Sequence, residues 1–129
     1  FSGMKAPKYF FTNIKRHGAL LAKGRMLGIQ FDTLFTDELY FKISRHAINM
    51  ATRIRSIFQK HGIAIAYDSP TNQQFVVLSP SLYEALSKKV AFEIWERKSD
   101  TEIICRFVTS WATKDKELDE LDDILQALS

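Results

Sequence analysis

The sequence has too little cysteine to build disulfide bonds within the chain. Its 129 residues contain one cysteine, Cys105, which excludes an internal disulfide and a zinc site built on cysteines. We take this usage to indicate a reducing, cytoplasmic location. Long apolar runs are also missing. No run approaches the roughly 18 to 20 residues needed to span a bilayer, so we expect no membrane partner.

The chain also has little excess of charge of either sign. The formal net charge is +3, with basic residues concentrated in the first half of the chain and acidic residues in the last segment. A nucleic-acid binder would need a recognition motif or a strong basic stripe, and neither is present. The three histidines, His17, His46 and His61, lack metal-ligand spacing with carboxylates or thiols. We therefore expect no nucleic acid partner and no metal.

The first 36 residues have the character of a connecting segment. Residues 1–8 begin with Phe, and we interpret them as a linker or the remnant of a tag on a piece of a longer protein. Residues 18–35 are predicted to form a helix that is apolar nearly all round, with small residues on part of its surface. Such a helix must bury more than one face. We assign residues 9–36 to a long interface helix from the side of a larger domain, covered by that domain or by a second subunit.

Residues 37–129 have the pattern of a small α/β domain. Apolar residues recur at three- and four-residue steps from Asp37 to Lys60, which predicts a helix, and Gly62 is a suitable C-terminal stop. Strands are predicted at residues 63–67, 74–78, 90–96 and 102–108, and further helices at 80–89 and from an N-cap near Thr113. The expected fold class is α+β in two layers. It consists of a long helix followed by a small C-terminal domain, whose about four-stranded, mostly antiparallel sheet is covered by helices.

Three stretches, taken in order, resemble one enzyme family. They are KRHGALLAKGRMLGIQF (Lys15 to Phe31), DSPTNQQFVVL (Asp68 to Leu78) and CRFVTSWAT (Cys105 to Thr113). Together they resemble the C-terminal third of proteins of the threonine aldolase/aromatic amino acid β-eliminating lyase family. These proteins belong to the fold type I, or aspartate-aminotransferase-type, pyridoxal-phosphate enzymes. The resemblance covers about Tyr9 to Leu128.

The resemblance implies a reaction, a cofactor and partners. Members of the family cleave a β-hydroxy-α-amino acid such as threonine to glycine and an aldehyde, with pyridoxal 5′-phosphate as electron sink. They are homodimers or homotetramers, so the expected partners are a large domain, a second copy and a small amino-acid substrate. The family's cofactor lysine lies upstream of the long helix. Lys5 has a faint resemblance to it but lies too close to the helix, so we expect this chain to be inactive alone.

Arg106 is the residue expected to bind substrate. It interrupts an apolar strand, where a guanidinium needs an anion to offset its desolvation. That anion is either a nearby Asp or Glu or, as the resemblance implies, the substrate α-carboxylate. The resemblance also implies that Lys23 and Arg25 meet the cofactor phosphate of the neighbouring subunit. The alternative for these two residues is a solvated basic face.

Several other residues are expected to have structural roles. We expect Cys105 to pack inside its strand, Trp95 and Trp111 to lie in the core or at a domain interface, and His46 and His61 to lie at the surface. The turn Asp68 to Asn72 is expected to support the hinge of the small domain. A non-catalytic oligomerisation or protein-binding module is the alternative function, with the helix over residues 18–35 as its partner surface.

Overall fold

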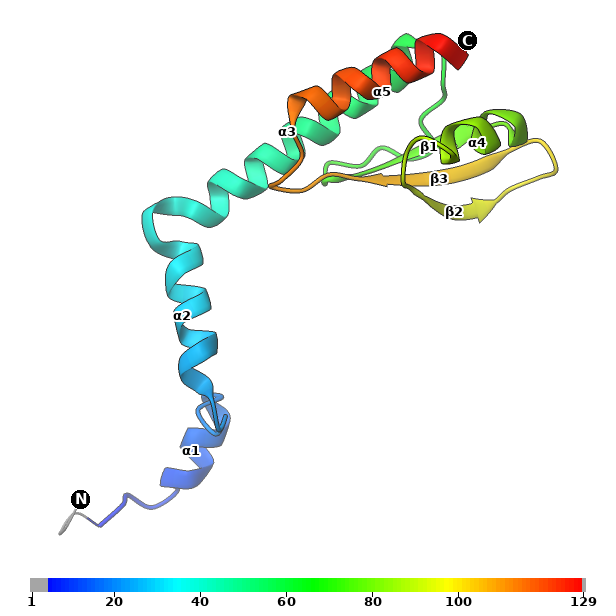
Figure 1. Cartoon of the computed structure of the whole chain (residues 1–129). Coiled ribbons are helices and arrows are strands. Elements are labelled where there is room, and N and C mark those ends of the chain that lie inside the picture. The colour runs from blue at the N-terminus through cyan, green and yellow to red at the C-terminus, as the bar shows by residue number, and fades with distance from the viewer. Residues whose placement is uncertain (1–4, 129) are drawn as a thin grey trace. The chain divides into compact units, whose positions relative to one another are not determined.

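The computed structural model describes residues 5–128, so the linker expected over residues 1–8 lies partly outside the described residues. In order, the elements are α1 (Phe10–Arg16), α2 (Gly24–Phe35), η1 (Thr36–Glu38), α3 (Leu39–Lys60), β1 (Gln73–Leu78), α4 (Pro80–Ser87), β2 (Glu93–Arg97), β3 (Ile103–Val108) and α5 (Asp115–Leu128) (Figure 1). The chain divides into two compact units, Phe1–Tyr40 and Phe41–Ser129. Within residues 5–128, no helix combines the length and hydropathy of a membrane span. The division into a linker, an interface helix and a small domain remains a prediction about their roles.

Over residues 5–35 the first unit contains two α-helices where the sequence predicts one. The chain leaves α1 at Gly18, which has a φ of +70°. The Gly18 N–H donates to the Lys15 carbonyl at 3.1 Å and the Ala19 N–H to the Ile14 carbonyl at 2.9 Å. This is the left-handed termination that glycine favours. The predicted helix over residues 18–35 is therefore right from Gly24 onward and wrong before it.

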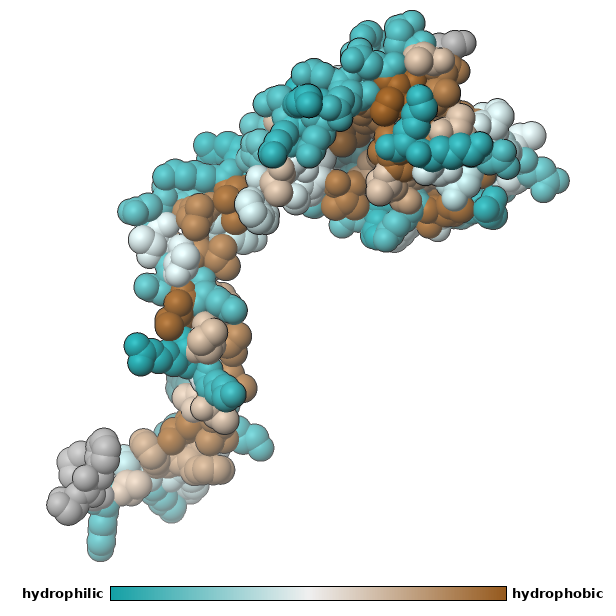
Figure 2. All heavy atoms as spheres, viewed as in Figure 1, coloured by the Kyte–Doolittle hydropathy of each residue, from teal (hydrophilic) through white to brown (hydrophobic). Residues whose placement is uncertain are grey.

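The helices of the first unit bury none of their side chains. Neither α1 nor α2 has a buried residue. The exposed large apolar residues of α2 are Met26, Leu27, Ile29, Phe31 and Phe35. Figure 2 shows brown, apolar side chains among teal ones along this helix. The apolar character that the sequence indicates is thus presented on the surface of this unit.

Helix α3 agrees with the predicted helix over residues 37–60, apart from its first turn. Asp37 and Glu38 have positive φ values of 51° and 58° and belong to the short turn η1, so the α-helix begins at Leu39. At the other end Gly62 has a φ of +71°. The Ile63 N–H donates to the Phe58 carbonyl at 2.9 Å, which closes the helix. The glycine stop is confirmed.

The sheet has three antiparallel strands in the order β1-β3-β2, which confirms the α+β class and corrects the strand count from about four. The missing strand is the segment 63–67. It makes one isolated bridge, between Ile65 and Val76. Two backbone hydrogen bonds accompany this bridge, Ala66 N–H to the Phe75 carbonyl at 2.8 Å and Val77 N–H to the Ala64 carbonyl at 2.9 Å. The segment therefore borders β1 without forming a regular strand.

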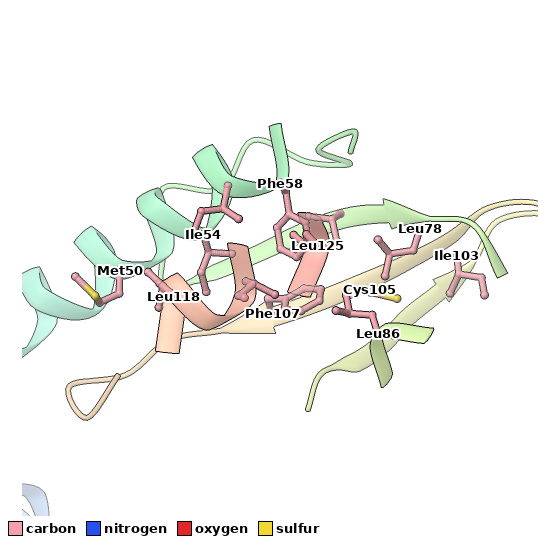
Figure 3. Packing of buried hydrophobic residues seen from close by; sticks show 13 residues of the cluster. Met50, Ile54, Phe58, Leu78, Leu86, Ile103, Cys105, Phe107, Leu118 and Leu125 are labelled. Carbon is pink, nitrogen blue, oxygen red and sulfur yellow. The ribbon is translucent and has the colours of Figure 1, made fainter. Parts of the chain in front are cut away.

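The core lies between one face of the sheet and the helices (Figure 3). It combines residues of α3 (Met50, Ile54, Ile57, Phe58), the strands (Val76, Leu78, Ile103, Cys105, Phe107), α4 (Leu86) and α5 (Leu118, Leu121, Leu125). The Phe58 and Phe107 ring centroids are 4.7 Å apart. Each large apolar side chain buried in this way contributes about 1.5–3 kcal/mol to folding.

Helix α5 begins slightly later than the sequence indicates. Thr113, the predicted N-cap, instead accepts a hydrogen bond from the Ser110 N–H at 2.9 Å through its Oγ1. The helix starts at Asp115, and the Glu117 carboxylate accepts from the Lys114 N–H at 2.9 Å. The cap at Thr113 is therefore wrong, because its hydroxyl closes the preceding turn.

Candidate functional site

Arg106 lies on the face of the sheet opposite the core. Its neighbours Cys105 and Phe107 are buried in the core, and successive side chains of a strand point to opposite faces. Across the strands Arg106 is the register partner of Phe75 on β1 and of Glu93 on β2. The sheet thus fixes the backbone of Arg106 on both sides.

Two of the three nitrogens of the Arg106 guanidinium have protein partners. Nη2 forms an ion pair with the Glu93 carboxylate, and Nη1 donates to Gln73 Oε1 at 3.3 Å. The Arg106 side chain is 27% exposed, whereas that of Glu93 is 69% exposed. Nε is buried and has no hydrogen-bond partner among residues 5–128. The ion pair considered from the sequence is present, yet it leaves the Nε donor of Arg106 without a partner.

A row of aromatic rings lies beside Arg106 on the same face. The Arg106 Cζ is 5.3 Å from the centroid of the Trp95 ring, within the range of a cation–π contact. The Trp95 ring meets Phe75 edge-on at 5.2 Å, and Phe75 meets Tyr67 at 5.5 Å. We call the set of Arg106, Glu93, Trp95, Phe75 and Tyr67 the Arg106 face.

A bulge in β2 explains why Trp95 joins this row. The pairing with β3 shifts register between Ile94 and Glu96, so Trp95 is the extra residue. Such a bulge turns a side chain to a new direction. Trp95 remains 53% exposed and Trp111 is 70% exposed, so the expectation that they lie in the core is wrong. Their alternative place at a domain interface remains a prediction.

A cavity of about 420 Å³ adjoins the aromatic row. Its walls include Tyr67, Val77, Glu96 and Ile104. At the wall of this cavity, the Tyr67 hydroxyl donates to the Glu96 carboxylate at 3.2 Å. Burial and the Glu96 charge both raise the pKa of Tyr67 above its ordinary value, burial being the larger cause. Tyr67 is therefore a hydrogen-bond donor here at neutral pH.

Lys23 and Arg25 lie together at the N-terminal end of α2, in the other unit of the chain. Lys23 directly precedes the helix and Arg25 belongs to its first turn, and both are exposed. The N-terminal end of a helix attracts anions, because its first N–H groups have no partner within the helix. This placement fits a phosphate ligand. Lys5 is exposed in an irregular segment before α1.

A second polar cluster was not predicted from the sequence. The His61 Nε2 lies 2.6 Å from Asp122 Oδ1, and Lys60 Nζ lies 2.7 Å from Asp122 Oδ2. The His61 side chain is 6% exposed, so the expected surface role of His61 is wrong. His46 is half-buried, with its Nε2 2.7 Å from the Thr113 carbonyl oxygen, so it is also more than a surface residue. The only sequence signal was the position of Asp122 next to the apolar stripe of its helix.

The turn before β1 is tied to the end of β3. The Asn72 side-chain amide donates to the Thr109 carbonyl at 2.7 Å, and the Thr109 hydroxyl donates to the Ala47 carbonyl at 2.7 Å. Thr109 is 1% exposed. These bonds connect α3, the turn and the strand that carries Arg106. The hinge role expected for the turn remains a prediction.

Cys105 is buried, as predicted. Burial raises the pKa of its thiol to about 11, while the charge of Arg97 opposes the shift. The thiol is therefore protonated at neutral pH and behaves as a small apolar side chain. Within residues 5–128 no group of three or more His, Cys, Asp or Glu side chains is arranged to hold a metal ion.

Comparisons with known proteins identify a relative. No protein-family model matches the chain. No curated protein matches it either. Among solved structures, the chain is similar to Leishmania major threonine aldolase, with 34% sequence identity and a TM-score of 0.82. The match covers 95% of this chain and 36% of that protein, so the chain spans about a third of its relative's length. The resemblance indicated by the sequence is confirmed.

Proposed function

Because the chain is related to threonine aldolase over nearly its whole length, we propose that it forms the C-terminal domain of a lyase dependent on pyridoxal 5′-phosphate. The reaction is cleavage of a β-hydroxy-α-amino acid such as threonine to glycine and an aldehyde. The cofactor, when bound, supplies the electron sink for bond cleavage. In this proposal the chain supplies substrate binding and subunit contacts, and it does not catalyse the reaction alone.

The unused donor of Arg106 carries this proposal. A guanidinium donates through a planar fork that matches a carboxylate in two parallel hydrogen bonds. Arg106 is held by two strands on the open face of the sheet, with Nε buried and without a partner among the described residues. In our proposal this guanidinium binds and orients the substrate α-carboxylate.

Two basic residues are suited to bind the phosphate group of the cofactor. Lys23 and Arg25 share the N-terminal end of α2, where the helix dipole adds to their charge. We propose that they contact the phosphate group of the cofactor. Lys5 has no such support, and we propose that the lysine that anchors the cofactor belongs to another part of the protein.

A titration of the chain with L-threonine tests the proposal at Arg106. Trp95 is the reporter because Arg106 lies over its ring, and Trp111→Phe removes the other tryptophan. We expect a saturable fluorescence change that Arg106→Gln weakens about 10- to 100-fold, the usual effect of losing a charge-assisted hydrogen bond. Arg97→Gln is the matched control, since it removes the same charge from the neighbouring strand. Equal responses to L-threonine and to threoninamide, which lacks the carboxylate, contradict the proposal.

Reduction with borohydride in the presence of pyridoxal phosphate tests the placement of the anchoring lysine. We expect no specific adduct on Lys5 by peptide mass mapping. An adduct on Lys5 that is lost in Lys5→Ala contradicts the proposal and places the anchoring residue in this chain. Lys8→Ala is the control, since Lys8 is exposed in the same region.

A non-catalytic oligomerisation module is the second candidate, and the exposed apolar side chains of α2 favour it. Leu27 and Phe31 are 45% and 64% exposed. Buried in a second copy or in a large domain, such side chains stabilise the assembly. Sedimentation of the chain distinguishes the cases: self-association that Leu27→Glu abolishes, without any threonine response, supports the module alone.

A further inference from the structure

We infer that Glu93 is an internal ligand of Arg106, which a substrate carboxylate displaces on binding. The inference rests on the proposed function. It makes Glu93 the residue that sets the affinity of the Arg106 face for anions and its preference for ligands with one carboxylate.

The register of the sheet holds Glu93 against Arg106. The two residues are direct partners across β2 and β3, so the pairing of the two strands fixes where their side chains start. The other contacts of the guanidinium, the Gln73 amide and the Trp95 ring, are uncharged. Among residues 5–128, Glu93 is the one carboxylate that pairs with Arg106. It therefore occupies the position that a ligand carboxylate needs.

The two partners differ in how freely they can leave the contact. Arg106 is 27% exposed and is held between neighbouring side chains, whereas Glu93 is 69% exposed. Glu93 can turn into water, where its own charge is solvated, and an incoming carboxylate then pairs with the partly buried Arg106 in its place. The exchange of one carboxylate for another preserves the charge at Arg106, and an exposed ion pair is weak. The structure thus favours displacement of Glu93 over movement of Arg106.

A free carboxylate gains a hydrogen bond that Glu93 does not make. Nε and Nη2 form one edge of the guanidinium, and a carboxylate that meets this edge accepts from both nitrogens. Glu93 occupies Nη2 only, and the Nε donor has no partner among the described residues. The unused donor gives an incoming carboxylate the advantage it needs to replace Glu93.

Displaced Glu93 remains beside the site and affects which ligands bind. Its backbone stays paired with that of Arg106, so its negative charge stays near the bound ligand. A second negative group on the ligand is repelled by that charge. The Arg106 face is therefore expected to prefer glycine and threonine over dicarboxylates such as succinate or aspartate.

The test compares Glu93→Gln with Glu96→Gln in the Trp111→Phe chain. Both variants remove one negative charge from β2, but Glu96 accepts from Tyr67, whereas the ion pair of Arg106 is with Glu93. Glycine and succinate are titrated separately, with Trp95 fluorescence as the signal. We expect Glu93→Gln to tighten glycine binding about two- to fivefold, the range that an exposed ion pair supports. We expect a larger gain for succinate, and no change in Glu96→Gln.

Two other results overturn the inference and identify which proposal fails. Equal effects of the two substitutions mean that overall charge, and not displacement, sets the affinity. The proposed function then survives if Arg106→Gln still weakens binding about 10- to 100-fold. A glycine response that Arg106→Gln leaves unchanged, or no response in any variant, overturns both proposals. Circular dichroism checks that Glu93→Gln is folded. If it is not, Glu93→Ser is titrated in its place with the same expected gain.

Discussion

His61 and Asp122 join the end of α3 to α5 through a contact of 2.6 Å between the imidazole Nε2 and the carboxylate Oδ1. Lys60 donates to the same carboxylate at 2.7 Å. Hydrogen bonds from Lys60, and then from His61, hold the pKa of the Asp122 carboxyl below its ordinary value. Lys60 and His61, at the C-terminal end of α3, therefore both contact one carboxylate in the middle of α5.

This arrangement predicts how stability depends on pH. A carboxyl whose pKa is lower in the folded state stabilises that state fully above its unfolded pKa, which is about 3.9. The stabilisation is lost as the pH falls through the lower, folded pKa. We expect Asp122→Asn to reduce the free energy of unfolding at neutral pH and to remove this part of its acid dependence. Urea unfolding measured between about pH 3 and pH 7 checks both effects.

Asp123→Asn provides the control for the pH experiment. Asp123 is the exposed neighbour of Asp122 on the same helix. The control is expected to leave the acid dependence of the wild-type chain in place. Parallel curves for the wild type and Asp122→Asn over the whole acid range contradict the assignment.

The hydroxyl of Thr109 is predicted to stabilise the connection after β3. It is buried and donates to the Ala47 carbonyl in α3 at 2.7 Å. Thr109→Val keeps the shape of the side chain but removes this hydrogen bond, which costs about 0.5–1.5 kcal/mol. Thr109→Ser keeps the hydroxyl and is expected to lose much less. Urea unfolding of the two variants checks this, and equal losses show that the methyl group matters more than the hydrogen bond.

The helices and strands of the second unit were predictable because their periodicities are regular. The apolar steps of α3 and the stop at Gly62 required only local information, and both are confirmed. The segment 63–67 has the composition of a strand but makes a single bridge, at Ile65. The composition of a segment shows that it can pair with a neighbouring strand. The number of backbone pairs that it makes with β1 depends on the path of the chain between Gly62 and β1.

The partners of Arg106 could not be predicted in the same way. The sequence indicates that a guanidinium in an apolar strand needs an anion, but Glu93 becomes that anion through the register of β2 against β3. Trp95 reaches Arg106 because of a bulge in β2, which no local sequence pattern predicts. The resemblance to threonine aldolases led to the hypothesis that Arg106 binds substrate, and the structure supplied the neighbours of Arg106.

Two glycines are predicted to respond to alanine in opposite directions. Gly62 has a φ of +71°, where a side chain costs roughly 1–2 kcal/mol, whereas Gly28 lies inside α2. An added Cβ meets no atom within 4 Å at either position, so crowding does not contribute to the difference. We expect Gly62→Ala to lower the free energy of unfolding by about that amount. In Gly28→Ala we expect a gain in helicity worth about 0.5–1 kcal/mol.

Urea unfolding and far-ultraviolet circular dichroism of both variants check these values. A neutral Gly62→Ala contradicts the left-handed conformation at the end of α3. Gly28→Ala has a second use, because α2 is the helix that we propose to contact a second copy or the large domain. If the substitution destabilises an assembled form of the chain, another backbone packs closely against Gly28, since the helix itself leaves room for a methyl group there. A gain in helicity with unchanged self-association places that contact on another part of α2.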